Sequence, residues 1–127
     1  MISLQDYNKS KDVKSLVSKL FEVRQVAHNV HLQTKSYSAH KALGDFYETL
    51  LDLTDDFVET YQGQHGILSG YEKIDVSPVA DVESYLDGAV KIFAAARENL
   101  KESHLQNIMD EIVALTYKTL YKLKNLK

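Results

Sequence analysis

Apolar residues recur every three or four positions along four long stretches of the chain, which is the spacing of one face of an α-helix. The first stretch runs from about residue 12 to 33, and the second from about 39 to 61. The third runs from about 78 to 100, and the fourth starts at about 103. One proline and five glycines in 127 residues leave few positions that would interrupt a helix. The periodicity therefore predicts an all-α protein.

The residues between the stretches predict where the helices begin and end. Ser36 and Ser38 supply capping hydroxyls before the second helix, and Gly63 and Gly66 are expected to end it. The longest connection follows, with the sequence GQHGILSGYEKIDVS over 63–77. It separates the first pair of helices from the second pair.

The pair Ser77-Pro78 has the pattern of an N-cap followed by proline at the first helical position. The run Ser103-His104-Leu105-Gln106 has the capping-box pattern. Residues 1–10 are polar and are expected to form an irregular lead-in. Four amphipathic helices with one longer connection predict an antiparallel four-helix bundle, folded as a single domain over 1–127.

Composition narrows the classes of function. The chain has no cysteine, which excludes disulfides, thiolate metal sites and cysteine nucleophiles. No apolar run approaches the length of a membrane span, and the first residues lack the apolar core of a signal peptide. We therefore expect a soluble, cytoplasmic protein. A net charge of −3 without a basic arm makes DNA an unfavourable partner.

The stretch from Arg24 to Glu59 concentrates the side chains that carry chemistry. It holds His28, His31 and His40, and it continues with a run of acids. The acids of the run are Asp45, Glu48, Asp52, Asp55, Asp56 and Glu59. Imidazole and carboxylate ligands together suit iron, manganese or zinc. The alternative interpretation is a pair of solvated polar helix faces, and the spacing alone leaves both open.

Helical spacing places His28 and His31 beside the apolar stripe of the first helix, on an edge that also carries Val17 and Phe21. Apolar residues on such an edge suggest that something covers it, most simply a second copy of the chain. We therefore expect a homo-oligomer, a dimer at least. A metal site would be shared across its two-fold interface.

Other chemistries lack their motifs. The chain has no glycine-rich phosphate loop, no nucleophile elbow and no HExxH sequence. No glutamate lies three residues before any histidine, so the Glu-x-x-His pair of di-iron helical bundles is absent. An ordinary di-iron centre inside the bundle is therefore not expected.

The order and spacing of these residues resemble the Dps-like branch of the ferritin-like proteins. His28 and His40 are twelve positions apart, and Asp55 and Glu59 follow His40 by fifteen and nineteen positions. The family also has an aspartate four residues after the second histidine, where this chain has Gly44. The segment HLQTKSYSAHKALGDFY also resembles the sequences of small uncharacterised proteins encoded by tailed phages.

The Dps-like resemblance implies a ferritin-like fold, Fe(II) oxidation or storage at the dimer interface, and a shell of up to twelve chains. The metal ligands that it implies are His28, His40, Asp55 and Glu59, with His31, Asp45 and Asp52 as further candidates. The rival hypothesis is a non-enzymatic helical structural or interaction protein, encoded by a phage, on the same scaffold. Fold alone does not decide between the two hypotheses.

Overall fold

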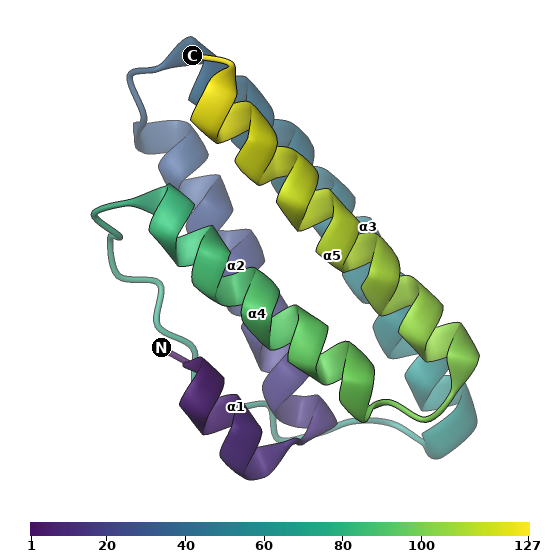
Figure 1. The fold of residues 1–127 in the computed structure, drawn as a ribbon. Helices are drawn as coiled ribbons and strands as arrows, with labels where there is room; N and C mark the ends of the chain where they lie inside the picture. The colour runs from purple at the N-terminus through teal and green to yellow at the C-terminus, as the bar shows by residue number, and fades with distance from the viewer.

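The computed structural model describes residues 1–127 and consists of five α-helices without a strand (Figure 1). The helices are α1 (Leu4–Ser10), α2 (Val13–Gln33), α3 (Tyr37–His65), α4 (Val82–Asn99) and α5 (Ser103–Asn125). The all-α prediction is confirmed. The four long helices lie side by side, an arrangement compatible with the bundle that the periodicity predicts.

The apolar stripes of the long helices meet in one core of 22 buried residues. Its largest fully buried side chains include Phe46 and Phe57 of α3, Phe93 of α4 and Met109 of α5. Helix α3 packs against both α2 and α5, and α4 packs against α5. The contact between α2 and α4 is sparser, and α1 lies against both of these helices. The side of the molecule between α2 and α4 is thus closed partly by α1.

The long connection over 66–81 crosses the length of the molecule (Figure 1). Helices α3 and α4 both start at the end of the molecule where α5 ends. Two contacts show this: Tyr37 and Lys122 line one groove, and Lys124 pairs with Asp87 of α4. The chain must therefore return from the end of α3 to the start of α4. This return explains why the middle connection is the longest.

Two of the four residues predicted to cap α3 do so. Ser38 lies inside the first turn of the helix, where its hydroxyl is hydrogen-bonded to that of Ser36. The Ser36 hydroxyl accepts a hydrogen bond from the Ala39 amide at 3.2 Å, so it caps the helix as expected. Gly66 ends the helix with a φ of 93°, a left-handed value that favours glycine. Gly63 lies inside the last turns of α3, which extends beyond the predicted end at Tyr61.

The prediction of an irregular lead-in over residues 1–10 is wrong, because Leu4–Ser10 form α1. A reciprocal capping box starts this helix: the Asp6 amide donates to the Ser3 hydroxyl, and the Ser3 amide donates to the Asp6 carboxylate. Tyr7 then packs into the core with 2% of its surface exposed. One cap and one buried side chain are sufficient to order the segment.

The predicted start of α4 is corrected, and α5 begins at Ser103 as expected but without the predicted cap. Helix α4 is capped by Asp81, whose carboxylate accepts the amides of Glu83 and Ser84, while Ser77 hydrogen-bonds to Asp75. Helix α5 begins at Ser103 with Glu102 in the cap position and no side-chain capping bond. The Glu102 carboxylate instead accepts a hydrogen bond from the imidazole Nε2 of His65 at the end of α3.

This bond from His65 lowers the pKa of Glu102 below its ordinary value of 4.5. A carboxyl group with a depressed folded-state pKa adds stability above its unfolded pKa, and this stability is lost as the pH falls through the folded value. We expect His65→Ala to raise the Glu102 pKa towards 4.5, as measured by an NMR titration of its side-chain carboxyl carbon. The stability difference between the two proteins should shrink as the solution is acidified.

The Asp81 carboxyl is the internal control for that titration, because the Ser84 hydroxyl lowers its pKa without any contribution from His65. Its titration curve should be the same in both proteins. An unchanged Glu102 curve in the variant would contradict the assignment of the shift to His65.

No helix of this structure combines the length and the apolar character that crossing a membrane requires.

Candidate functional site

The three histidines of the predicted site lie where α2 packs against α3, in a row of rings that contains two stacked pairs. The His31 and His40 rings are 3.8 Å apart between centroids and nearly parallel, at 16°. His28 stacks on Tyr47 of α3 at 4.2 Å and 12°. All four side chains are half-buried. The short turn between the helices brings these residues together within one chain, whereas the predicted metal site was expected to be shared between two chains.

Two reciprocal hydrogen bonds tie His31 to His40. The His31 Nδ1 lies 2.6 Å from the His40 carbonyl oxygen, and the His40 Nδ1 lies 2.7 Å from the His31 carbonyl oxygen. A carbonyl oxygen can only accept, so each Nδ1 carries the proton and donates it. The His31 carbonyl is in the last turn of α2, where carbonyl groups lack a partner within the helix. The imidazole of His40 therefore closes the end of α2.

This arrangement does not fit a metal ion bound within one chain. An ion bonded to an imidazole lies in the plane of the ring, along the lone pair of the free nitrogen. Two stacked, nearly parallel rings keep their lone pairs in separate planes, so the His31 and His40 nitrogens do not converge on one point. No three histidine, aspartate or glutamate side chains of the chain are grouped so as to hold a metal ion.

The carboxylates of the predicted site form no hydrogen bonds with the imidazoles. Asp45, Asp52, Asp55 and Glu59 are all exposed along α3, and none of them takes part in a hydrogen bond or an ion pair. A Cβ atom built on Gly44, the position of the ligand aspartate in Dps-like proteins, would lie 2.9 Å from Cε1 of His31. The His31 ring thus fills the space that a side chain at position 44 would need.

The edge that was expected to be covered by a second copy has partners in its own chain. Val17 is fully buried in the core. The Phe21 ring meets the edge of the Tyr71 ring from the 66–81 connection, with 5.2 Å between centroids. Apolar character on this edge is therefore explained without a dimer, and the oligomeric state stays a prediction.

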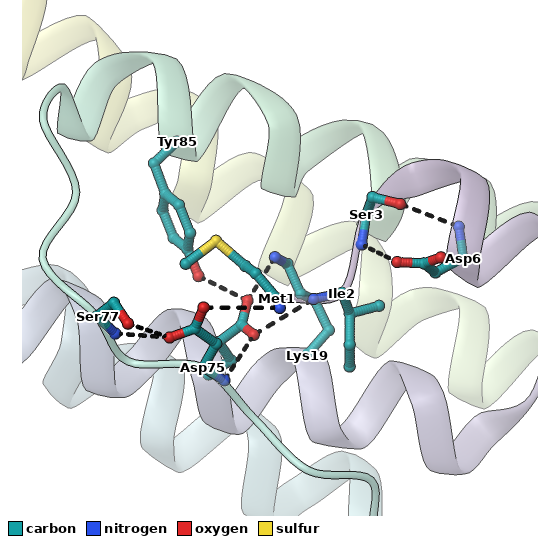
Figure 2. A network of polar contacts seen from close by, with 9 residues as sticks. Met1, Ile2, Ser3, Asp6, Lys19, Asp75, Ser77 and Tyr85 are labelled. Carbon is teal, nitrogen blue, oxygen red and sulfur yellow. Dashed lines mark hydrogen bonds and ion pairs between the residues drawn. The ribbon is translucent and has the colours of Figure 1, made fainter.

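A second polar cluster, which the sequence did not predict, surrounds the fully buried carboxylate of Glu22 in α2. Its Oε2 accepts from the Lys19 ammonium at 2.6 Å and from the Tyr85 hydroxyl of α4 at 3.0 Å. Its Oε1 accepts from the backbone amides of Ile2 at 3.4 Å and Asp75 at 3.3 Å. Figure 2 shows Lys19, Tyr85, Ile2 and Asp75 converging from four separate segments. We call these five residues the Glu22 cluster.

The Glu22 cluster is an ion pair held away from water. Lys19 is 3% exposed, and its ammonium also lies 4.9 Å from the centre of the Tyr85 ring. Burial raises the pKa of Tyr85 far above its ordinary value of 10.0, and the Glu22 charge raises it further. The Tyr85 hydroxyl therefore stays protonated and serves as a donor to the carboxylate.

Two serines of α2 close to Glu22 also form hydrogen bonds with the 66–81 connection. The Ser18 hydroxyl accepts from the Glu72 amide at 2.9 Å, and the Ser15 hydroxyl donates to the Glu72 carboxylate. Ser15, Ser18 and Glu22 follow helical spacing, and all three are buried. A polar stripe on α2 thus holds the backbone of the 66–81 connection, which has no secondary structure of its own.

Comparison with known proteins gives a family without an assigned activity. The model of a family of unknown function, DUF5856, matches residues 31–123. An uncharacterised 14.6 kDa protein from the mobD-ri intergenic region of Enterobacteria phage T4 is 28% identical in an alignment of 101 residues, and the alignment covers 76% of this chain and 75% of that protein. No solved structure matches the chain. The likeness to a phage protein agrees with the phage resemblance, while the Dps-like resemblance has no support in these comparisons.

Proposed function

Because this chain belongs to the family of unknown function DUF5856, we propose its role from its own surface: a phage-encoded, non-enzymatic helical protein that acts by binding another protein chain. The likeness to the T4 protein supports the phage origin. The packing of the histidines supports a role without chemistry, because the rings of His31 and His40 are stacked and their free nitrogens do not converge on one point.

The observation that carries the proposal is a group of exposed apolar side chains at one end of the molecule. Tyr37 is 78% exposed and Leu32 is 68% exposed at the α2–α3 turn, and the C-terminal end of α5, which lies beside it (Figure 1), exposes Tyr121 and Leu126. We call these four residues the tyrosine end. A groove of about 310 Å³ between Tyr37, Lys41, Lys122 and Leu126 joins the two segments. Exposed tyrosines beside a groove are typical anchors of protein interfaces.

The test is site-specific photo-crosslinking in cells that express the full chain. A photoreactive phenylalanine analogue at position 37 should give a covalent adduct with one partner protein, which mass spectrometry identifies. The matched control is the same analogue at Thr60, an exposed position at the other end of α3. With the purified partner, Tyr37→Ala should weaken binding by about tenfold or more. Equal adducts at both positions, or none, would contradict the proposal.

A second copy of the chain is the first partner to test, since we expect a homo-oligomer. Sedimentation of the purified protein should then give a dimer or a larger assembly, up to the shell of twelve implied by the Dps-like resemblance. Tyr37→Asp should reduce the assembly to a monomer if the tyrosine end is the contact. A monomeric wild-type protein would direct the search to a different chain.

A second candidate function is metal binding at a site shared by two chains, with His28, His40, Asp55 and Glu59 as ligands and iron, manganese or zinc as the ion. One observation favours it: the Nδ1–H groups of His31 and His40 donate to backbone carbonyls, as in many metal-ligating histidines, and leave Nε2 free. His31, Asp45 and Asp52 remain secondary ligands in this scheme. DNA stays an unfavourable partner, given the net charge of −3.

Metal content and Fe(II) oxidation, measured on size-fractionated protein, test this candidate. Stoichiometric metal that is lost in His40→Ala and retained in His104→Ala, a change at an exposed histidine of α5, would establish the site. Wild-type protein that takes up no iron, manganese or zinc would eliminate it.

A further inference from the structure

A groove of about 480 Å³ lies between the N-terminal segment and α4, next to the Glu22 cluster. Just over half of its lining residues are hydrophobic, among them Ile2, Leu4 and Ile92. Pockets of this size and character are the usual binding places for small molecules in proteins. The groove is separate from the histidine row and from the tyrosine end.

The charges that line the groove have one sign. Lys19 and Lys91 are its charged side chains, and no carboxylate reaches it. Lys91 is exposed at the mouth, while Lys19 is buried. Because Lys19 is paired with Glu22, the unpaired charge at the groove is that of Lys91, and this charge favours a ligand with a negative group.

The hydrogen bonds of the Glu22 cluster leave a donor available, but no acceptor. A carboxylate offers about four lone-pair positions, and Glu22 already receives four donors. An ammonium group carries three N–H donors. Lys19 directs one of them to Glu22 and lies over the Tyr85 ring, which leaves at least one donor without a hydrogen-bond acceptor. A buried cation with unused donors beside an apolar groove is complementary to a carboxylate on an apolar chain.

We propose that this groove binds a small amphipathic carboxylate, with its aliphatic chain against Ile2, Leu4 and Ile92 and its carboxylate at Lys19. Lys91 adds a second positive charge at the mouth. This binding site goes beyond the proposed protein–protein interaction and does not depend on it, since the two surfaces share no residue.

The probe is octanoate, titrated into the full chain below its micelle-forming concentration and followed by amide NMR shifts. Shifts are expected around Ile2, Lys19, Gly88 and Ile92. 1-Octanol, which has the same chain and no charge, should bind about tenfold more weakly, because a hydrogen bond to a charged group is stronger than one to a neutral group. Equal affinity for the two probes would overturn the assignment of the carboxylate to Lys19.

Gly88→Leu is the blocking variant. A Cβ atom at Gly88, which lines the groove, would meet no atom within 4 Å, so the new side chain enters open space without disturbing the core. The matched control is Gly63→Leu, because Gly63 also lies in a helix and is equally unobstructed. Octanoate binding should be lost in Gly88→Leu and unchanged in Gly63→Leu. Binding that survives in Gly88→Leu, or no binding to the wild-type chain, would overturn the proposal.

Lys91→Glu gives an independent readout of charge, because Lys91 is exposed and its replacement leaves the Lys19–Glu22 pair intact. It should weaken octanoate several-fold and leave 1-octanol unaffected. The same loss for both probes would show that charge does not select the ligand, and would overturn the proposal.

Discussion

Glu22→Gln is expected to reduce the free energy of unfolding by about 3–5 kcal/mol, because it removes one partner of a buried ion pair. The Lys19 ammonium would remain buried without its counter-charge at 2.6 Å. The new side chain would keep one oxygen and place an NH2 group at the other position, where it faces donors: either Lys19 and Tyr85, or the amides of Ile2 and Asp75. Urea denaturation followed by circular dichroism measures the loss.

The matched control is Glu98→Gln, since the Glu98 side chain is 74% exposed and its ion pair with Arg97 lies at the surface. It should change stability by no more than about 0.5 kcal/mol. The double variant Lys19→Met/Glu22→Gln removes both charges and should recover much of the loss, because no unpaired charge remains. If Glu22→Gln and Glu98→Gln were equally stable, the Glu22 cluster would not be a buried ion pair in solution.

The Glu22 cluster also predicts which part of the protein loses stability first in Glu22→Gln. The Asp75 amide is anchored on Glu22, and the 66–81 connection has few other bonds to the helices. Hydrogen exchange at Asp75 should therefore accelerate in Glu22→Gln more than exchange in the centre of α3. In this fold the buried carboxylate mainly stabilises the position of the connection and of the N-terminal segment.

The long helices could be predicted from the sequence because each buries a stripe of apolar residues that repeats over several turns. Leu16, Leu20 and Val23 of α2 and Phe46, Leu50 and Phe57 of α3 are all buried as the periodicity predicts. Helix α1 could not be predicted in this way, since Leu4–Ser10 are too short to show a repeat. Its signal was local: the capping box of Ser3 and Asp6, followed by one buried tyrosine.

The starts of α4 and α5 depend on contacts between distant residues. Ser77-Pro78 and Asp81 are both reasonable caps, and the choice falls on Asp81 because Ser77 is held by Asp75, whose amide is bound to Glu22. Ser103 has the capping-box pattern, but Glu102 of the preceding position is held by His65 from α3. Local patterns cannot rank such alternatives, because the deciding partners lie far away in the sequence.

For the candidate site, the sequence showed that three histidines lie on two helices joined by a short turn, but it predicted neither the orientation of their rings nor the separation of the carboxylates from them. The short turn at Thr34–Ser36 places His31 beside His40, and helical spacing brings His28 to Tyr47. Whether imidazoles stack or open towards an ion depends on ring orientation, which spacing does not determine. The Glu22 cluster was missed because a search for apolar periodicity passes over charged residues. Its signal was Lys19 and Glu22, three positions apart within the buried stripe of α2.

Gly44→Ala is expected to be about 1–3 kcal/mol less stable than Gly63→Ala, a substitution of the same kind in the same helix. Alanine in a helix interior ordinarily stabilises by up to about 1 kcal/mol over glycine, and Gly63→Ala should show this gain because its Cβ meets nothing within 4 Å. At Gly44 the new methyl group would lie 2.9 Å from Cε1 and 3.1 Å from Nδ1 of His31.

The His31 ring cannot move aside freely, because it donates to the His40 carbonyl, stacks on the His40 ring and meets the Tyr47 ring edge-on. Relief of the clash must break that bond or separate α2 from α3 near the turn. Urea denaturation of the two variants measures the difference, and the His31 and His40 ring signals in NMR report whether the pair has opened. A Gly44→Ala protein as stable as Gly63→Ala, with unshifted ring signals, would mean that His31 does not occupy this space in solution. Position 44 would then be free to carry a side chain.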